Sequence, residues 1–94
     1  MINIDFKLLV FITAARHLNF TKAAREMHIS QPAVSKNICD LEMQAGRNLF
    51  VRNRHKLSLS EAGRILLDHA MRIRCIYEEL NKELVKAKEI MADE

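Results

Sequence analysis

The 94-residue chain has only one proline and two glycines, so it has little room for tight turns and favours long helices. No stretch approaches about 18 uncharged apolar residues, and the sequence therefore predicts no membrane-spanning helix and no membrane partner. The first residues, MINIDFKLLVF, have no basic segment before the apolar run and no small-residue cleavage site. A signal peptide is therefore not expected, and the predicted location is the cytoplasm.

Residues that bind metals or carry catalysis are sparse and widely spaced. Cys39 and Cys75 form no CxxC motif, so we expect two reduced thiols, with a redox switch as the alternative. The four histidines show neither an HExxH motif nor the Cys/His spacing of zinc sites, which predicts no metal and no cofactor. The serines have no paired histidine or acid at a suggestive spacing, and no glycine-rich phosphate loop exists. A small enzyme is therefore the weakest hypothesis.

Positive charge is concentrated in the first two-thirds of the chain. Residues 1–60 carry nine Lys/Arg against four Asp/Glu, a balance of +5, whereas residues 61–94 carry six against eight, a balance of −2. The basic part suits a polyanionic partner, although an ordinary solvated surface can have the same charge. Charge alone does not distinguish a polyanion-binding surface from an ordinary solvated one. The helical patterns are needed to decide between these two interpretations.

Apolar periodicity predicts two helices before the proline. The first extends from about Asp5 to Arg16, with Asn3 as its cap, and its apolar residues recur at three- and four-residue steps. They are Ile4, Leu8, Phe11, Ile12 and Ala15. The chain then breaks at HLNF, and Thr21 is expected to cap a second helix, KAAREM. Its apolar positions are Ala23, Ala24 and Met27.

Pro32 marks the start of a third helix. His28 is expected to end the second helix in left-handed backbone, Ile29 to point inward, and Ser30 to cap the next helix. Pro32 is then the second helical residue, where an amide has no intrahelical partner to lose. The start of this helix is thus fixed to within a residue or two, which matters if its first turn presents atoms to a ligand.

Helical projection gives the third helix a buried stripe and an exposed arc. The stripe consists of Val34, Ile38, Leu41 and Ala45. The arc holds Pro32, Lys36, Cys39, Asp40 and Met43, is flanked by Ala33 and Ser35, and has Gln31 at its leading end. Its amide, methyl, ring, hydroxyl and ammonium groups are able to contact base edges in a DNA major groove. A purely solvated face is the alternative.

Two short helices joined by a three-residue turn form a helix-turn-helix. The segment FTKAAREMHISQPAVSKNICDLE resembles the DNA-binding domain of LysR-type transcriptional regulators, and LFVRNRHKLSLSEAG is similar to a later segment of the same family. The resemblance covers nearly the whole chain. It implies a mainly α fold, in which residues 1–60 form a winged helix-turn-helix of three helices and a two-stranded β wing.

The wing also has its own sequence signals. Gly46 is expected to end the third helix, Leu49 and Phe50 to close the core, and RNRHK to form an exposed basic loop between extended segments. The resemblance implies a set of DNA contacts, to which neighbouring cations are added: Thr21, Lys22, Ser30, Gln31, Pro32, Ala33, Ser35, Lys36, Arg52, Arg54 and His55. The chain departs from the family pattern at Lys36, Ala45, Arg54 and His55, where arginine, leucine, glycine and a basic residue are usual.

Residues 61–94 are expected to form one long helix capped by Ser60. Its apolar residues alternate steps of four and three, the seam of a coiled coil: Leu66, Ala70, Ile73, Tyr77, Leu80, Leu84, Ala87 and Met91. About thirty residues give roughly 45 Å of helix, too long to bury against a small domain. The sequence thus predicts a homodimer through this linker helix. A helix folded back on its own core, or a module that binds a different protein through the seam, is the alternative.

The resemblance also sets expectations for the partners. It implies a dimer that binds double-stranded DNA at an interrupted inverted repeat. Family members normally continue into a large effector-binding domain, of which nothing is present, so we expect either a DNA-binding fragment or an unusually short regulator. A small-molecule effector and higher oligomers are expected only in a longer protein that has such a domain.

Overall fold

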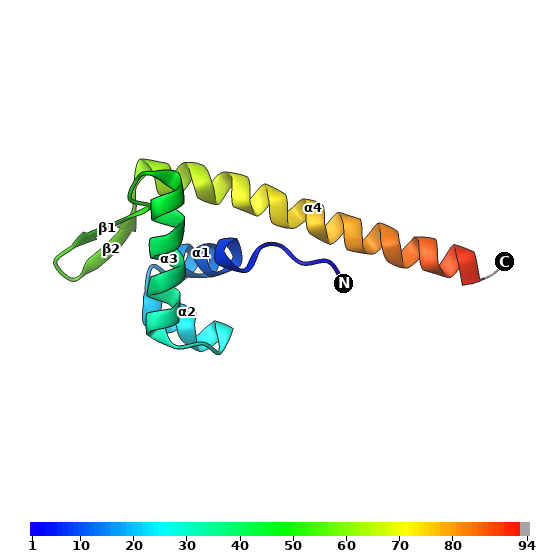
Figure 1. Ribbon diagram of the computed structural model, residues 1–94, viewed down its shortest axis with the longest axis horizontal. Helices are drawn as coiled ribbons and strands as arrows, with labels where there is room; N and C mark the ends of the chain where they lie inside the picture. The colour runs from blue at the N-terminus through cyan, green and yellow to red at the C-terminus, as the bar shows by residue number, and fades with distance from the viewer. Residues whose placement is uncertain (93–94) are drawn as a thin grey trace.

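The computed structural model describes the backbone of residues 1–92 and the side chains of residues 1–88. Its elements are α1 (Phe6–His17), α2 (Phe20–Met27), α3 (Gln31–Ala45), β1 (Phe50–Asn53), β2 (Lys56–Leu59) and α4 (Glu61–Ala92). The first three helices form a body, the two strands project from it, and α4 extends away from it (Figure 1). The fold is the predicted winged helix-turn-helix followed by a long helix. No helix among the described residues combines the length and apolar character needed to span a membrane.

The core lies between the first three helices and the base of the wing. Phe11 and Ile38 are fully buried there, and the paired Ala23 and Ala24 let α2 approach its neighbours closely. The predicted stripe of α3 is confirmed at Val34, Ile38 and Leu41. The prediction for Ala45 is wrong, because this last residue of α3 lies at an open groove beside α4 and is exposed.

Two helix starts differ from the sequence prediction. The Asp5 carboxylate accepts hydrogen bonds from the backbone N–H groups of Lys7 (2.8 Å) and Leu8 (3.4 Å), so Asp5 caps α1 in place of Asn3. The Asn19 side chain accepts from the Lys22 N–H at 2.9 Å and caps α2. Thr21 is therefore the second residue of that helix rather than its cap. In both cases the observed cap lies two residues from the predicted one.

The turn before α3 is as predicted. His28 ends α2 with φ 56°, in the left-handed region, and Ile29 packs against the core. Ser30 Oγ accepts from the Ala33 N–H at 3.2 Å, and Pro32 is the second residue of α3. Because the cap and the proline act together, the first turn of α3 has a fixed starting point.

The chain between α3 and the wing is held by a carboxylate. Gly46 ends α3 with φ 68°, and Leu49 and Phe50 are buried, as predicted. Glu42 Oε2 accepts the N–H of Leu49 at 2.8 Å and that of Phe50 at 3.5 Å. Glu42 therefore satisfies backbone donors that neither α3 nor the strand pairing reaches.

The first turn of α4 rests directly on this junction. Ser60 Oγ accepts from the Gly63 N–H at 2.9 Å, which confirms the predicted cap. A Cβ at residue 63 would lie 2.1 Å from the Leu49 carbonyl oxygen, so only glycine permits this approach. Leu66 and Leu67 then pack on the core, and α4 is anchored to the body by its N-terminal part.

Ala70 has no exposed surface, because it is buried within its own chain against Ile4 and Ile12. The prediction that Ala70 is part of a seam facing another subunit is therefore wrong. Its neighbour on the same face, Tyr77, packs against the same small cluster.

Candidate nucleic-acid interface

The first turn of α3 presents its polar groups to solvent. Gln31, Pro32 and Lys36 are exposed, whereas Ala33 and Ser35 are half-buried. Gln31 Nε2 donates to Ser35 Oγ at 3.2 Å, which places the two side chains side by side along the helix. The turn thus offers an amide, a pyrrolidine ring, a methyl group and hydroxyls together, in the order that the sequence predicts.

An acid lies next to the basic residue of this arc. Asp40 Oδ2 is 3.9 Å from Lys36 Nζ and 3.7 Å from Lys7 Nζ. Because the Lys36 side chain is 80% exposed, the pair is screened and its geometry is loose. Asp40 therefore orients Lys36 without immobilising it.

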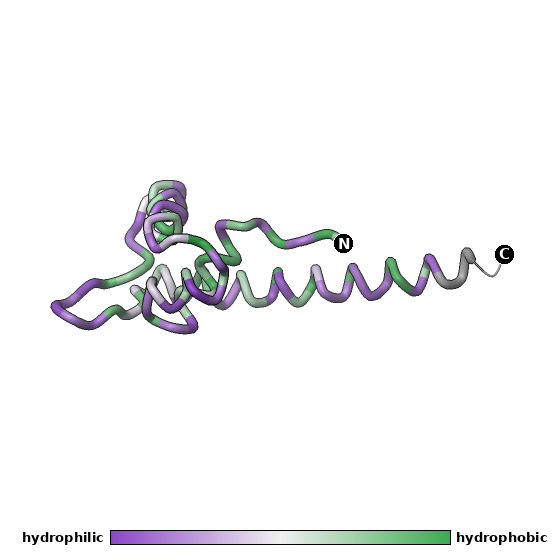
Figure 2. Tube along the Cα trace, turned by 90° about the horizontal axis from the view of Figure 1, so that it is seen from below, coloured by the Kyte–Doolittle hydropathy of each residue, from purple (hydrophilic) through white to green (hydrophobic). Residues whose placement is uncertain are grey.

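The wing is an antiparallel hairpin with a very short turn. The pairs run from Phe50↔Leu59 to Asn53↔Lys56, so that the predicted loop RNRHK is mostly strand and only Arg54 and His55 form the turn. Arg54 has φ 55°, the left-handed conformation that favours glycine. Figure 2 shows that the far end of this hairpin is hydrophilic. The wing tip thus carries a basic residue in strained backbone.

Arg52 is held where the wing meets the helices. Its guanidinium carbon lies 5.1 Å from the centroid of the Phe20 ring, within the range of a cation–π contact. The Phe20 ring in turn meets Phe50 edge-on, with centroids 5.2 Å apart. Phe20 was not singled out from the sequence, because nothing in the local pattern shows that the start of α2 lies beneath the wing.

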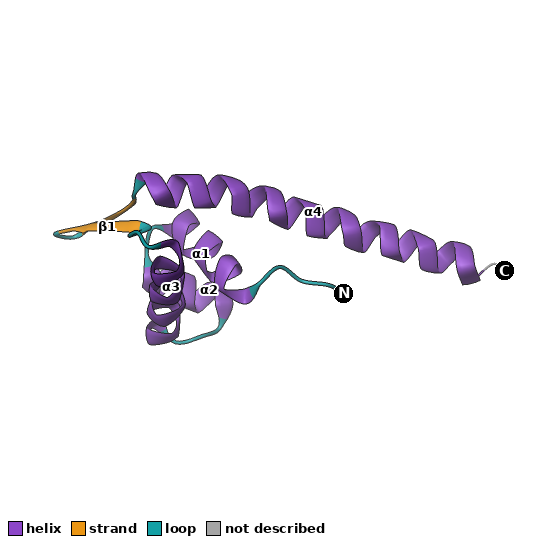
Figure 3. Ribbon diagram, turned by 45° about the horizontal axis from the view of Figure 1, so that its top comes forward, coloured by secondary structure: helices purple, strands orange, loops and turns teal. Residues whose placement is uncertain are grey.

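The two parts of the candidate interface share one cleft. Ser35 and Cys39 of α3 line it from one side, and Val51 and Arg52 of β1 from the other. Thr21 and Lys22 are exposed in the first turn of α2, directly after Phe20. Figure 3 shows the hairpin extending away from α3, and Arg54 and His55 form the turn at the end of this hairpin. The structure therefore brings Ser35 and Arg52 to one cleft and leaves the wing tip apart.

Known proteins resemble this chain in sequence. A family model described as "Bacterial regulatory helix-turn-helix protein, lysR family" matches residues 7–64. The chain belongs to the LysR family. The HTH-type transcriptional regulator CfxR of Cupriavidus necator is 40% identical over 84 residues, which cover 89% of this chain and 26% of CfxR. The Hca operon transcriptional activator HcaR of Escherichia coli is 37% identical over 84 residues, 89% of this chain and 27% of HcaR. The chain spans about a quarter of the length of these curated relatives.

Solved LysR-family structures share the fold. The CbnR DNA-binding domain in complex with DNA has a TM-score of 0.82 at 29% identity, covering 90% of this chain and 99% of that one. Vibrio fischeri DarR in complex with DNA also has a TM-score of 0.82, at 26% identity, covering 95% of this chain and 31% of DarR. The whole arrangement of body, wing and long helix is therefore that of LysR-family DNA-binding domains.

In this LysR-family chain, α4 exposes a different apolar stripe from the predicted one. Ile76, which the seam prediction omitted, is 62% exposed, more than Ile73 (38%) or Leu84 (47%). Leu66, Tyr77 and Leu80 are half-buried, and Ala87 is exposed. The side chain of Met91 lies outside the described residues. The exposed stripe consists of Ile65, Ile73, Ile76 and Leu84, with the half-buried Leu80 between them, along one side of α4 of the LysR domain.

An ion-pair cluster connects the C-terminal ends of α1 and α2. Glu26 Oε1 lies 2.9 Å from His17 Nε2, and its other oxygen pairs with Arg16. The hydrogen bond from His17, with the charge of Arg16 beside it, holds the pKa of the Glu26 carboxyl below its usual range. When Glu26 is ionised, this cluster stabilises the contact between the C-terminal ends of α1 and α2 in the LysR domain.

The remaining reactive side chains of the LysR domain are isolated. Cys39 and Cys75 are both exposed free thiols. Among the described residues, no three His, Cys, Asp or Glu side chains lie close enough together to hold a metal ion.

Proposed function

We propose that this chain is the DNA-binding part of a LysR-type transcriptional regulator, and that it binds double-stranded DNA sequence-specifically as a homodimer. The observation that carries the proposal is the exposed first turn of α3, whose start is fixed by the Ser30 cap and Pro32. Residues 1–60 are the winged helix-turn-helix DNA-binding domain in this proposal, and residues 61–94 are the dimerisation helix. The protein acts in the cytoplasm by binding, not by catalysis.

Base edges are read by the first turn of α3. The Gln31 amide has a donor and an acceptor at the spacing of the adenine N6 and N7 atoms. The Pro32 ring and the Ala33 methyl group suit contact with a thymine methyl group, and the Ser35 hydroxyl suits either a donor or an acceptor. These four residues are the proposed readers, because they lie on the exposed side of a helix narrow enough for the major groove.

Phosphate contacts set the register of the domain on the duplex. The proposed phosphate contacts come from α2, from α3 with its cap, and from the wing, and they carry no sequence information themselves. They are Thr21, Lys22, Ser30, Lys36, Arg52, Arg54 and His55. Arg52 is the best-placed cation, because Phe20 holds it at the shared cleft. Arg54 and His55 suit the backbone or the minor groove beyond it.

The exposed stripe of α4 supports the proposed dimer. Ile73, Ile76 and Leu84 are large apolar side chains in solvent along one helix face, and pairing two such helices removes them from water. A dimer places two copies of α3 on one duplex, which suits an interrupted inverted repeat. A small-molecule effector and a higher oligomer belong, in this proposal, to a longer regulator with an effector-binding domain.

The test of sequence readout is Gln31→Ala against the matched control Gln44→Ala, an exposed glutamine at the other end of the same helix. The preferred duplex is first selected from a random pool. Gln31→Ala should lose about 1–3 kcal/mol on that site and relax the preference at one or two positions. Gln44→Ala should bind as the parent protein does. An unchanged preference in Gln31→Ala would reject Gln31 as a reader.

The test of DNA binding itself is the dependence of affinity on salt. If each subunit neutralises four or five phosphates, the dimer neutralises about nine, and log K falls with log salt at a slope near −8. Arg52→Ala should reduce the slope by about two per dimer. A protein-interaction module would show no duplex binding at moderate salt. A slope shallower than about −3 would mean that the basic surface lies away from the DNA.

A further inference from the structure

Among the side chains that the structure describes, the C-terminal half of α4 has a further attachment to the rest of the chain. Tyr77 packs against a small cluster that contains Ile4 of the N-terminal segment as well as Ile12 of α1 and Ala70. This segment, residues 1–5, precedes α1 and runs beside α4 (Figure 1). The direction of α4 relative to the body therefore depends on what holds these few residues against it.

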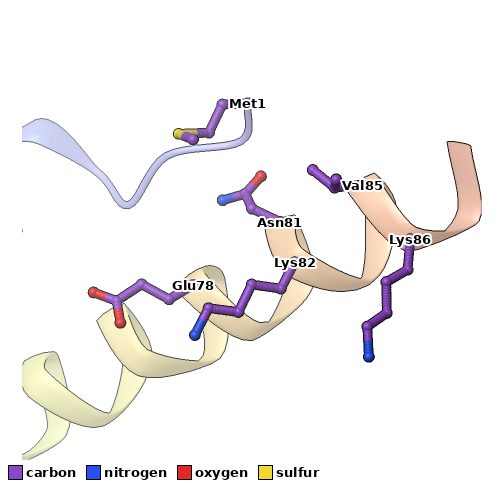
Figure 4. Close-up of a pocket in the computed structure, with 6 residues that line it drawn as sticks. All are labelled: Met1, Glu78, Asn81, Lys82, Val85 and Lys86. Atoms are coloured by element: carbon purple, nitrogen blue, oxygen red, sulfur yellow. The ribbon is translucent and has the colours of Figure 1, made fainter. Parts of the chain in front are cut away.

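Asn81 holds the N-terminal segment against α4 through hydrogen bonds to Ile2. Its Oδ1 atom accepts the Ile2 N–H at 2.8 Å, and its Nδ2 atom donates to the Ile2 carbonyl oxygen at 2.6 Å. The second Nδ2 hydrogen bonds the Tyr77 carbonyl oxygen at 2.9 Å, which fixes the amide orientation. Figure 4 shows the Asn81 side chain pointing from α4 toward the segment that begins at Met1. One side chain thus bonds both backbone polar groups of a residue 79 positions away in the sequence.

Only a side-chain amide matches this arrangement. At neutral pH an aspartate accepts but does not donate, and an apolar side chain does neither. Asn81 therefore pairs with Ile2 as a neighbouring strand would. Asn81 projects about 140° around the helix from Ile76 and about 60° from Leu84, so the clamp lies beside the exposed stripe and not on it.

We propose that Asn81 is a positioning residue that sets the direction of α4, and through it the half-site spacing that the dimer accepts. The inference rests on the proposed DNA-binding dimer. About 16 Å of helix separates Ala70 from Asn81, so a tether at Asn81 resists tilting of α4 far better than the packing near its start. In a dimer joined through α4, that tilt determines the distance between the two copies of α3. A fixed tilt favours one spacing over its neighbours.

The experiment compares Asn81→Ala and Asn81→Asp with the control Lys82→Ala, an exposed neighbour that makes no bond to Ile2. Each protein is bound to a single half-site and to full sites with different spacer lengths. Hydrogen exchange at the Ile2 amide is measured without DNA. Both Asn81 variants should exchange faster at Ile2, remain dimeric and bind the half-site normally. Their preference for the best spacer over its neighbours should fall by about fivefold.

Three results would overturn the clamp alone, and two of them concern the Asn81 variants. One is unchanged exchange at Ile2 in Asn81→Ala, since the bonds would then be absent in solution. The other is faster exchange with an unaltered spacer preference. If the parent protein binds neither half-site nor full site, the proposed function is wrong and the spacing role falls with it. Flattened spacer preference in Lys82→Ala as well would also reject a specific role for the amide.

Discussion

The guanidinium group of Arg52 lies over the ring of Phe20, 5.1 Å from its centroid, although the two residues belong to different elements. Arg52 is on the wing and Phe20 begins α2. The same ring packs edge-on against Phe50, so one aromatic side chain supports both the base of the wing and its inner cation. The position of the proposed phosphate contact is therefore set by the core.

Phe20→Leu should show energetic coupling to Arg52→Ala. The free energy of unfolding of the parent, both single variants and the double variant should yield a coupling of about 0.5–1 kcal/mol, the usual size of an exposed cation–π contact. Urea denaturation measures it. Arg54→Ala, which has no contact with the ring, is the control partner and should show no coupling to Phe20→Leu. Zero coupling with Arg52→Ala would mean that the contact contributes nothing in solution.

Asp40→Asn should strengthen DNA binding. The carboxylate lies within 3.9 Å of Lys36 Nζ, and its removal releases that ammonium group and eliminates a negative charge near the phosphates. We expect affinity to rise about three- to tenfold on preferred and scrambled duplexes alike, with the gain shrinking at high salt. Asp68→Asn, which removes an exposed acid paired with Arg72 on α4, should have no such effect. An unchanged or lower affinity in Asp40→Asn would contradict the placement of Lys36 at the DNA.

Arg54→Gly should stabilise the wing while weakening DNA binding. Relief of the left-handed conformation at φ 55° is worth about 0.5–1 kcal/mol of folding free energy after the entropy cost of glycine. Arg54→Ala removes the same charge but keeps the strain. Thermal unfolding should therefore separate the two variants, whereas both should lose the same DNA affinity. Equal stability of the glycine and alanine variants would show that the turn is not strained.

Stability should fall in acid through Glu26. Its pKa is lowered in the folded protein, so the unfolded chain binds this proton more readily, and the contribution of the group is lost as pH falls below about 4.5. Glu26→Gln should be less stable than the parent at neutral pH and should lose less on acidification. Urea denaturation over a pH series measures this, with Glu79→Gln on α4 as control. Parallel pH profiles for the parent and Glu26→Gln would contradict the prediction.

Leu80→Glu combined with Leu84→Glu should dissociate the proposed dimer and leave the winged domain folded. Facing glutamates would suffer desolvation and mutual repulsion together. Met71→Glu combined with Val85→Glu is the control, because these residues are apolar and exposed, as Leu84 is, but lie on another side of α4. Sedimentation gives the oligomeric state, and full-site binding should be lost with dimerisation. A folded, dimeric Leu80/Leu84 variant would show that the exposed stripe is not the interface.

The sequence predicted most accurately the features that short-range chemistry decides. The cap at Ser30, the proline in the first turn of α3, and the left-handed ends at His28 and Gly46 each depend on neighbouring residues only. The same local signals predicted the wrong cap where two candidate capping residues lie close together in the sequence. Asn19 and Thr21 are both good caps, and the choice of Asn19 extends α2 to include Phe20, which the core requires.

Long-range packing was beyond the sequence. A repeat of fours and threes shows which residues share a face of α4, but it does not show which face the body covers. Ala70 therefore looked like part of an outer seam, whereas Ile4 and Ile12 bury it. The contact between Phe20 and Arg52, and the bonds between Asn81 and Ile2, join residues from distant parts of the chain. No local pattern contains them.

The close approach of Gly63 to the Leu49 backbone predicts that mutations at this position impair DNA binding. Any side chain at this position meets the Leu49 carbonyl oxygen, and Leu49 immediately precedes the strand that carries Arg52. A substitution there must displace the backbone at the base of the wing. A screen for loss of operator binding should therefore recover alleles at codon 63, although the glycine touches no nucleotide. Suppressors of such alleles are expected among residues that line the Leu49 junction, rather than among those of the recognition helix.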